Sequence, residues 1–355
     1  MKIYILINDI TRHAGMERAV CNLANSLITN HEVTLLSRDT ISGKSYFPLH
    51  EKVRIEHLGT DIFHSSAFGK IFVYFQMFKK LKQIANKNRD SVFIATISTV
   101  NAMITLLKRY VKTVGCEHFN YESACFRQRV LRRMIYPRLD AVVLLTQADS
   151  KHYTFIKRDR LFIIPNSISF TSNETAACEE KRIIAVGRLE PQKGFDFLLD
   201  AAVILKKEIP DWHLDIFGDG EKKIELLQKI SYLYLEDFVF INEPTPNIKE
   251  EFLKSSIYVM SSRYEGLPMV LLESQYLGLP AVSFDCPTGP SEIIMQNETG
   301  FLVPLYDTAE LAKKIIELAE NTEKRKQFGI NARKYSDRFS AASIAEKWED
   351  LLQRI

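Results

Sequence analysis

Short apolar runs alternate with longer segments of helical period along the chain, and this alternation constrains the fold more than any other feature. The runs of the first half are rich in β-branched residues and almost unbroken in hydrophobicity, and they span 2–8, 32–36, 91–97, 112–116 and 141–146. Strands that are buried on both faces of a parallel sheet have this appearance. Residues 16–30 place apolar side chains at the spacing of one helix face. The first half therefore predicts a β-α-β series.

The pattern restarts after residue 165. Further apolar runs, separated by helical segments such as 194–209 and 247–256, lie at 182–189, 212–220, 238–242, 257–262 and 280–285. A chain of 355 residues is longer than one hydrophobic core usually supports. We expect two doubly wound α/β domains that face a cleft, at 1–165 and 166–337. Residues 338–355, with Ser340 or Ser343 as a cap, should form a last helix that packs back on the first domain.

Composition and charge narrow the class of protein. No run of 18 apolar residues occurs, and the apolar start is too short for a signal peptide, so we expect a cytoplasmic protein. The five cysteines have no C-x-x-C spacing, which argues against a disulfide framework and against a zinc site. Residues 1–165 hold 25 Lys and Arg against 13 Asp and Glu, whereas the remainder holds 22 against 31. The first half is therefore the part expected to meet an anionic surface or acceptor.

Residues at strand ends are the candidates for a site, because doubly wound sheets bind ligands beyond the carboxyl ends of their strands. Near the end of the run at 182–189, Arg188, Lys193 and Gly194 combine a guanidinium, an ammonium and the N–H groups of a helix start. This combination suits a diphosphate. Taken alone, the segment is equally compatible with an ordinary solvated loop.

The segment "SSRYEGLPMVLLES", residues 261–274, repeats this chemistry. Pro268 suits a helix start, where Met269 and Val270 would leave their N–H groups free. Glu265 precedes that start, and Glu273 lies about one and a half turns inside the helix. Each glutamate alone is more often a solvated or capping residue. As a pair, they can address two parts of one elongated ligand whose anionic middle rests on the helix end.

Two residues of the first half are candidates by position. Gly15 lies in a strand-to-helix loop and would let the backbone approach a phosphate. His118 lies just past a strand end, where its ring could donate to a sugar hydroxyl or share a proton, although a lone histidine is more often structural. The first turn lacks G-x-G-x-x-G, which disfavours a nicotinamide dehydrogenase.

These motifs together resemble the retaining glycosyltransferases of family four, which have the two-domain GT-B fold. Glu265 and Glu273 match the family's E-x7-E motif, and "GRLEPQKG" at 187–194 matches its G-R-L-x-x-x-K-G element. "IIPNSI" at 163–168 matches the domain linker, and "HAGMERAV" at 13–20 the N-terminal glycine-rich loop. The likeness runs through essentially the whole chain, and the most similar members assemble bacterial surface glycans.

The resemblance implies a retaining transfer from a nucleotide sugar, with a UDP-sugar preferred and a GDP-sugar still open. It assigns the donor sugar to Glu265 and the ribose to Glu273, and it places His118 near the reacting sugar, so Glu265 and His118 are the expected catalytic residues. Arg188 and Lys193 would hold the diphosphate, and Ile241 and Asn242 match the position that contacts the base. The full donor-binding set is Gly15, Arg188, Lys193, Ile241, Asn242, Glu265, Leu267, Pro268, Met269, Val270 and Glu273.

The chain also departs from the family's pattern. The usual paired glycines of the N-terminal loop are Ala14 and Gly15, and the glycine usual after the strand at 238–241 is Asn242. The first departure concerns how closely a phosphate can approach the backbone, and the second concerns the base pocket. No cofactor or metal is expected, in keeping with the absence of any D-x-D sequence.

Two basic and aromatic segments, 68–89 and 126–138, indicate the acceptor side. Helices of this composition suit an anionic membrane surface. The cations expected to meet the membrane or the acceptor are Lys79, Lys80, Arg129, Arg132 and Arg133. The alternative is an apolar stripe that faces the core, with a solvated basic face. A polyprenyl-diphosphate glycan would account for both residue types, on a peripheral protein at the inner face of the cytoplasmic membrane.

Three other functions compete with this interpretation. A nucleotide-sugar 2-epimerase shares the fold and would convert the donor without an acceptor. A non-catalytic partner subunit would bind the sugar nucleotide without turnover. A nucleic-acid-binding protein is disfavoured by the acidic second half and by the lack of a helix-turn-helix or zinc pattern, so no nucleic-acid partner is expected.

Overall fold

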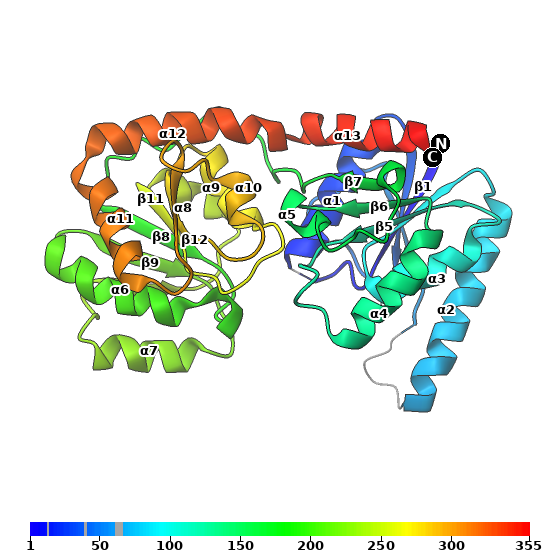
Figure 1. The fold of residues 1–355 in the computed structure, drawn as a ribbon, viewed down its shortest axis with the longest axis horizontal. Coiled ribbons are helices and arrows are strands. Elements are labelled where there is room, and N and C mark those ends of the chain that lie inside the picture. Colours follow the sequence, from blue (N-terminus) through cyan, green and yellow to red (C-terminus); the bar gives the residue numbers. More distant parts are fainter. Residues whose placement is uncertain (13, 39–40, 61–66) are drawn as a thin grey trace. The chain divides into compact units, whose positions relative to one another are not determined.

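The computed structural model describes residues 1–12, 14–38, 41–60 and 67–355. Its contacts divide the chain into two units, each built on a parallel sheet (Figure 1): unit 1 comprises Met1–Ser169 and Ser340–Ile355, and unit 2 comprises Phe170–Phe339. These limits differ by a few residues from the expected 1–165, 166–337 and 338–355. The glycine-rich loop "HAGMERAV" begins at His13, which lies outside the described residues.

Unit 1 contains a seven-stranded sheet in the order β3-β2-β1-β4-β5-β6-β7, with every pair parallel. Its strands are β1 (Lys2–Ile7), β2 (Glu32–Ser37), β3 (Arg54–His57), β4 (Val92–Ala95), β5 (Lys112–Glu117), β6 (Ala141–Leu144) and β7 (Leu161–Ile163). Its helices are α1 (Gly15–Leu27), α2 (Ala67–Lys87), α3 (Ser98–Ile104), α4 (Phe126–Ile135), α5 (Gln147–Ser150) and α13 (Ala341–Arg354), with short 3₁₀ turns η1 (Thr105–Leu107), η2 (Tyr136–Arg138) and η3 (Arg158–Arg160).

Alternate residues of β1 pack into two different apolar layers, because successive side chains of a strand point to opposite faces. Ile3 and Ile5 belong to a cluster with residues of α1 and α13. Tyr4 and Leu6 belong to a second cluster with residues of α2 and α3. This is why the strand appears in the sequence as an unbroken apolar run.

The C-terminal helix α13 packs on unit 1, as predicted. Ser340 caps the helix by accepting the N–H of Ser343. Trp348 is buried in the same cluster as Ile3, and Glu349 lies 3.0 Å from Nε2 of His31. The last segment of the chain therefore completes the core of the unit that the first segment begins.

Unit 2 contains a six-stranded parallel sheet in the order β10-β9-β8-β11-β12-β13. Its strands are β8 (Arg182–Val186), β9 (His213–Phe217), β10 (Val239–Asn242), β11 (Ile257–Met260), β12 (Ala281–Phe284) and β13 (Gly300–Val303). Its helices are α6 (Phe195–Glu208), α7 (Lys223–Tyr232), α8 (Ile248–Leu253), α9 (Met269–Tyr276), α10 (Pro290–Ile293), α11 (Thr308–Glu320) and α12 (Thr322–Ser336), with 3₁₀ turns η4 (Pro191–Lys193) and η5 (Asp337–Phe339).

Each sheet reverses its strand order beside its first strand, between β1 and β4 in unit 1 and between β8 and β11 in unit 2. Such reversals open a crevice at the carboxyl ends of the strands, where doubly wound sheets bind their ligands. In unit 2 the loops on either side of the reversal carry Lys193 and Glu265. The two-sheet architecture predicted from the sequence is confirmed. Among the described residues, no helix is long and apolar enough to span a bilayer.

Candidate active site

The loop after β8 is shaped by two glycines. Gly187 follows the strand, and the aliphatic part of the Lys193 side chain lies over it, only 3.2 Å from where a Cβ would be. Gly194 adopts the left-handed conformation with φ of 62° at the start of α6. A Cβ at Gly194 would lie 2.1 Å from the carbonyl oxygen of Ser261, so glycine is required for the close approach of the loop after β11.

Lys193 and Glu265 meet where these two loops approach. Nζ of Lys193 lies 2.7 Å from Oε1 of Glu265, and the hydroxyl of Ser262 donates to the same oxygen at 2.7 Å. The Glu265 side chain is only 7% exposed and that of Lys193 18%. Thr288 donates to the backbone carbonyl of Glu265. The carboxylate is therefore held in one position by an ammonium and a hydroxyl.

Helix α9 starts one residue later than the sequence suggested. Pro268 is the cap, with φ of −73° and ψ of 103°, and Met269 is the first helical residue. The N–H groups of Met269 and Val270 still belong to the first turn, which has no helical acceptors for them. Leu267, Pro268 and Met269 are buried, whereas Val270 is half-buried. The predicted helix start is thus present, with its cap three residues after Glu265, and anion binding by it stays a prediction.

Glu273 is fully buried within α9. Its carboxylate and that of Glu265 both act on Tyr258 of β11: burial first, and then the negative charges of Glu265 and Glu273, raise the pKa of the phenol. The charges of both glutamates of the motif therefore reach one buried tyrosine, which stays protonated. The predicted contact of Glu273 with ribose hydroxyls requires the donor to reach a carboxylate that is buried in this structure.

The other residues of unit 2 that were predicted to bind the donor lie near strand ends but differ in exposure. The Arg188 side chain is 60% exposed and pairs with Glu190 at 2.8 Å. Asn242 ends the edge strand β10; its amide donates to Asp215 at 2.9 Å, and its carbonyl accepts the N–H of Gly218. Ile241 is half-buried. A base contact at this strand end would therefore depend on Ile241 and on backbone atoms more than on the Asn242 side chain.

Gly15 and His118 belong to unit 1. Gly15 is the first residue of α1, and a Cβ on it would meet no atom within 4 Å, so the space beside it is open. His118 directly follows β5 and is half-buried. Its Nδ1 is buried without a hydrogen-bond partner among the described residues. Burial lowers the pKa of His118 to about 4, so the ring is neutral near pH 7.

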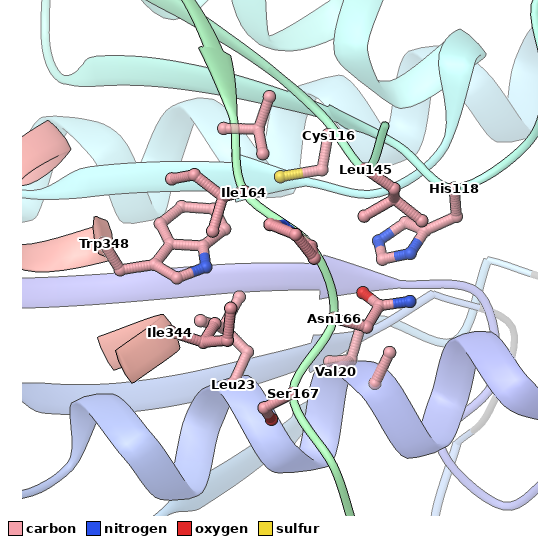
Figure 2. A pocket seen from close by; sticks show the side chains of 13 residues that line it. Val20, Leu23, Cys116, His118, Leu145, Ile164, Asn166, Ser167, Ile344 and Trp348 are labelled. Atoms are coloured by element: carbon pink, nitrogen blue, oxygen red, sulfur yellow. The ribbon is translucent and has the colours of Figure 1, made fainter. Parts of the chain in front are cut away.

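His118 lines a cavity within unit 1 whose walls are otherwise largely apolar. Figure 2 shows its ring with Leu145 and Asn166 at the end of the cavity opposite to Trp348. The walls come from α1, the ends of β5 and β6, the segment 164–167 and α13. A neutral ring whose Nδ1 has no acceptor is best protonated at Nε2, because a buried N–H without a partner costs more than an unused lone pair. His118 is thus arranged to donate a hydrogen bond from Nε2.

The cations assigned to the membrane or acceptor do not share one environment. Lys79, Lys80 and Arg133 are exposed, Lys80 donates to the carbonyl of Leu58, and Arg129 is half-buried. The prediction for Arg132 is wrong. Arg132 is 2% exposed and pairs with the buried Glu117 at 2.5 Å, because the face of α4 that carries it turns toward β5.

Helices α2 and α4 each combine a packed face with exposed apolar residues. On α2, Met77, Leu81 and Ala85 are buried, which matches the alternative of a stripe that faces the core. The same helix exposes large apolar side chains at its start, and α4 exposes a further set at a spacing of four residues; these are Ile71, Phe72 and Phe75 of α2 and Phe126, Val130 and Met134 of α4.

Several residues that build the candidate site were not predicted from the sequence. Ser262, Thr288, Arg263 and Asp196 hold the loops of Lys193 and Glu265, and none was among the candidates. Ser262 could have been found, because it lies two residues after Met260, where β11 ends. The pairing of Arg263 with Asp196 has no local signal, since the two residues are 67 positions apart.

Comparisons with known proteins show the family and the fold of this chain. A model described as Glycosyltransferase Family 4 matches residues 13–171, and one described as Glycosyl transferases group 1 matches residues 169–335. The amylovoran biosynthesis glycosyltransferase AmsD of Erwinia amylovora is 32% identical over 99% of this chain and 99% of its own. A Campylobacter jejuni α-1,4-N-acetyl-D-galactosaminyltransferase, named for a diNAcBac-PP-undecaprenol acceptor, is 31% identical over 100% of this chain and 99% of its own.

Two solved structures show the same fold at low sequence identity. HepE of Anabaena in complex with UDP-glucose has a TM-score of 0.80 and 18% identity, with 100% of both chains covered. A variant of TarM from S. aureus in complex with UDP and α-GlcNAc-glycerol has a TM-score of 0.82 and 15% identity, with 99% of both covered. The fold is GT-B. The chain belongs to the family 4 glycosyltransferases and is a glycosyltransferase of the type that assembles bacterial surface polysaccharides.

Proposed function

We propose that this glycosyltransferase retains the anomeric configuration of the sugar, takes it from a UDP-sugar and adds it to a lipid-linked glycan. The observation that carries the proposal is the cluster of Lys193, Glu265 and Ser262 at the start of α9, on the strand-order reversal of unit 2. A GDP-sugar remains the alternative donor. The UDP complexes of HepE and TarM support the uridine base, because these proteins share the fold.

Both cations of the proposed diphosphate site now hold carboxylates that a donor would replace. The exposed pair between Arg188 and Glu190 contributes only about 0 to 1 kcal/mol, so Arg188 can turn to a phosphate at little cost. Lys193 is bonded to Glu265 in a largely buried position. A doubly charged diphosphate beside the first turn of α9 would draw Lys193 away from Glu265, and the freed carboxylate would then face the donor sugar.

The chemistry proposed for these residues is stabilisation of charge on the leaving diphosphate. Departure of the diphosphate leaves an oxocarbenium-like sugar and builds negative charge that Arg188, Lys193 and the N–H groups of Met269 and Val270 can stabilise. Glu265 would stabilise the positive sugar ring, and His118 would donate a hydrogen bond to a sugar hydroxyl. Because protein cations supply this charge, we further propose that turnover needs no metal and is unchanged by a chelator.

The acceptor is proposed to be a polyprenyl-diphosphate glycan at the inner face of the cytoplasmic membrane. The name of the Campylobacter relative, which gives a PP-undecaprenol acceptor, supports this choice. So do the exposed aromatic side chains at the start of α2 and the exposed cations Lys79 and Arg133. The excess of basic residues in the first half adds a long-range attraction to anionic lipid.

The test is a calorimetric titration of wild-type protein against a panel of nucleotides and nucleotide sugars, followed by transfer assays of Lys193→Ala and Glu265→Ala. Each variant should lose transfer by at least about a hundredfold, as expected when a group that stabilises the transition state is removed. Lys207→Ala, which removes an 82% exposed lysine from the same unit, is the matched control. Wild-type turnover in either site variant would refute the site.

The same assays separate the competing functions. Conversion of a UDP-sugar without any acceptor would indicate an epimerase. Tight binding of UDP by purified protein, with no turnover of donor in the presence of any glycan tested, would indicate a partner subunit.

A further inference from the structure

Arg263 links the two loops that carry Lys193 and Glu265. Its Nη1 donates to the carbonyl of Pro191 at 2.6 Å and to Oδ1 of Asp196 at 2.9 Å, and its Nη2 donates to Oδ2 of Asp196 at 2.7 Å. The guanidinium thus forms a two-pronged ion pair with the start of α6 and caps a carbonyl of η4 at the same time. A planar guanidinium can make all three bonds from one position, which an ammonium cannot do.

Further contacts hold the same two segments together. The guanidinium carbon of Arg263 lies 4.4 Å from the centre of the Phe197 ring. The backbone N–H of Arg263 donates to Gln192, and the Gln192 side chain donates to the carbonyl of Tyr264 at 3.0 Å. Each of the segments 263–264 and 191–197 therefore donates hydrogen bonds to the other.

The residues that these contacts join lie beside the site in the sequence. We call the bonds of Arg263 to Asp196 and Pro191 the clamp. Gln192 directly precedes Lys193, and Arg263 lies two residues before Glu265. The direct bond between Lys193 and Glu265 also joins the loops, but it is the bond that a donor diphosphate would replace. The bonds of Arg263 go to Asp196 and Pro191, which are not part of the proposed donor set, so they can persist when the donor is bound.

We propose that Arg263 is a positioning residue that fixes the separation of Lys193 and Glu265, so that one ligand can meet both. This inference rests on the proposed function, because it takes the Lys193 and Glu265 pair as the donor site. Its consequence is specific. Loss of the bonds from Arg263 to Asp196 and Pro191 should weaken nucleotide binding and raise the KM for the donor. The KM for the acceptor and the secondary structure should stay unchanged.

The experiment compares Arg263→Lys with a matched control in the same unit. Arg182, the first residue of β8, also bridges two carboxylates, from Nε to Asp215 at 2.5 Å and from Nη2 to Glu251 at 2.7 Å. It lies at the opposite end of its strand from the site. Arg182→Lys removes a comparable ion-pair network. Asp215 holds the Asn242 amide through its other oxygen, Oδ1, so nucleotide binding should stay unchanged. Arg263→Lys should raise the Kd for UDP about tenfold and raise the donor KM to a similar extent.

A second variant approaches the clamp from its other side. Asp196→Asn removes the negative charge that pairs with Arg263 and should reproduce the tenfold loss of affinity for UDP. The double variant with Arg263→Lys should bind no more weakly than the weaker single variant, because both changes break one interaction. Equal losses of UDP affinity in Arg263→Lys and Arg182→Lys, multiplying losses in the double variant, or unchanged affinity in both clamp variants would overturn the proposal.

Failure of the clamp and failure of the site give different results. If Lys193→Ala binds UDP as wild type does, the proposed donor site is wrong and the clamp has nothing to position. If Lys193→Ala loses UDP while Arg263→Lys and Asp196→Asn retain it, the donor site stands and only the positioning role is refuted. Should Arg263→Lys prove unstable, as judged by its circular dichroism and Tm, Asp196→Asn provides the same comparison.

Discussion

At the scale of single residues, Arg132 and Arg133 are neighbours with opposite environments. Arg132 is buried against Glu117, which also accepts hydrogen bonds from Tyr136 and Asn101. Burial raises the pKa of Glu117, although Arg132, Tyr136, Asn101 and Ser98 all act to lower it. Arg133 is exposed. One arginine therefore stabilises the fold, and the other is available to the surroundings.

Arg132→Ala should lower the free energy of unfolding by about 3 to 5 kcal/mol, because it leaves a buried carboxylate without its cation. Arg133→Ala should change it by less than about 0.5 kcal/mol. Without Arg132, the folded-state pKa of Glu117 lies further above its unfolded value. The loss should therefore be smallest near pH 5 and grow as the pH rises to 8. Urea unfolding at both pH values checks this, and equal losses for the two arginines would contradict it.

His118 gives a second pH dependence at this scale. Its pKa is about 4 in the folded protein and about 6.5 in the unfolded chain. Between these values only the unfolded chain takes up the proton, so this site should destabilise the protein as the pH falls from 6.5 to 4, by at most about 3 kcal/mol. His118→Gln should lose less stability than wild type between pH 7 and 5. Parallel unfolding free energies in urea over that range would contradict the burial of a neutral ring.

At the scale of helices and strands, the start of α2 exposes apolar side chains on the same helix as the exposed cations Lys79 and Lys80. Phe72 and Phe75 are 60% and 64% exposed. Replacing both with glutamate should reduce flotation with anionic liposomes about tenfold or more, because apolar burial and charge attraction are both lost. Ile224→Glu with Leu227→Glu on α7, where the side chains are 72% and 47% exposed, is the control and should float as wild type does. Equal losses of flotation in the α2 and α7 double variants would contradict the membrane proposal.

The strands also show which elements can be predicted from the sequence and which cannot. Strands buried on both faces, such as β1 and β11, stood out as apolar runs and were confirmed. Strands β3, β7 and β13 were not predicted. β3, "RIEH", is an edge strand whose residues are at least partly exposed, so it lacks an apolar run. β7 has 3 residues, all of them only partly buried, and the apolar run of β13 is confined to the short stretch between Gly300 and Pro304.

The residues of the candidate site also divide into those that the sequence predicts and those that it does not. Lys193, Glu265 and the start of α9 follow from strand ends and helix starts, which are local in the sequence. Arg263 with Asp196, and Arg132 with Glu117, depend on which helix face meets which loop, and packing decides that. Arg132 and Arg133 are adjacent, so no composition rule for their helix could separate the buried cation from the exposed one.

At the scale of the whole molecule, the chain returns to its first unit through α13, and each unit contains one of the two tryptophans. Trp348 lies in α13, and Trp212 lies in the core of unit 2. Leu351 of α13 is fully buried in the cluster of unit 1. Leu351→Ala should therefore destabilise unit 1 by about 2 to 5 kcal/mol, the cost of a core truncation.

This change can be followed separately in the two units. In a Trp212→Phe background, the remaining fluorescence reports on unit 1, and Leu351→Ala should lower the urea midpoint. In a Trp348→Phe background, the fluorescence reports on unit 2, and the midpoint should stay unchanged because every residue of the apolar cluster that contains Leu351 belongs to unit 1. Midpoints that fall together in both backgrounds would show that the units unfold as one, and that the last helix stabilises the whole molecule instead of the unit on which it packs.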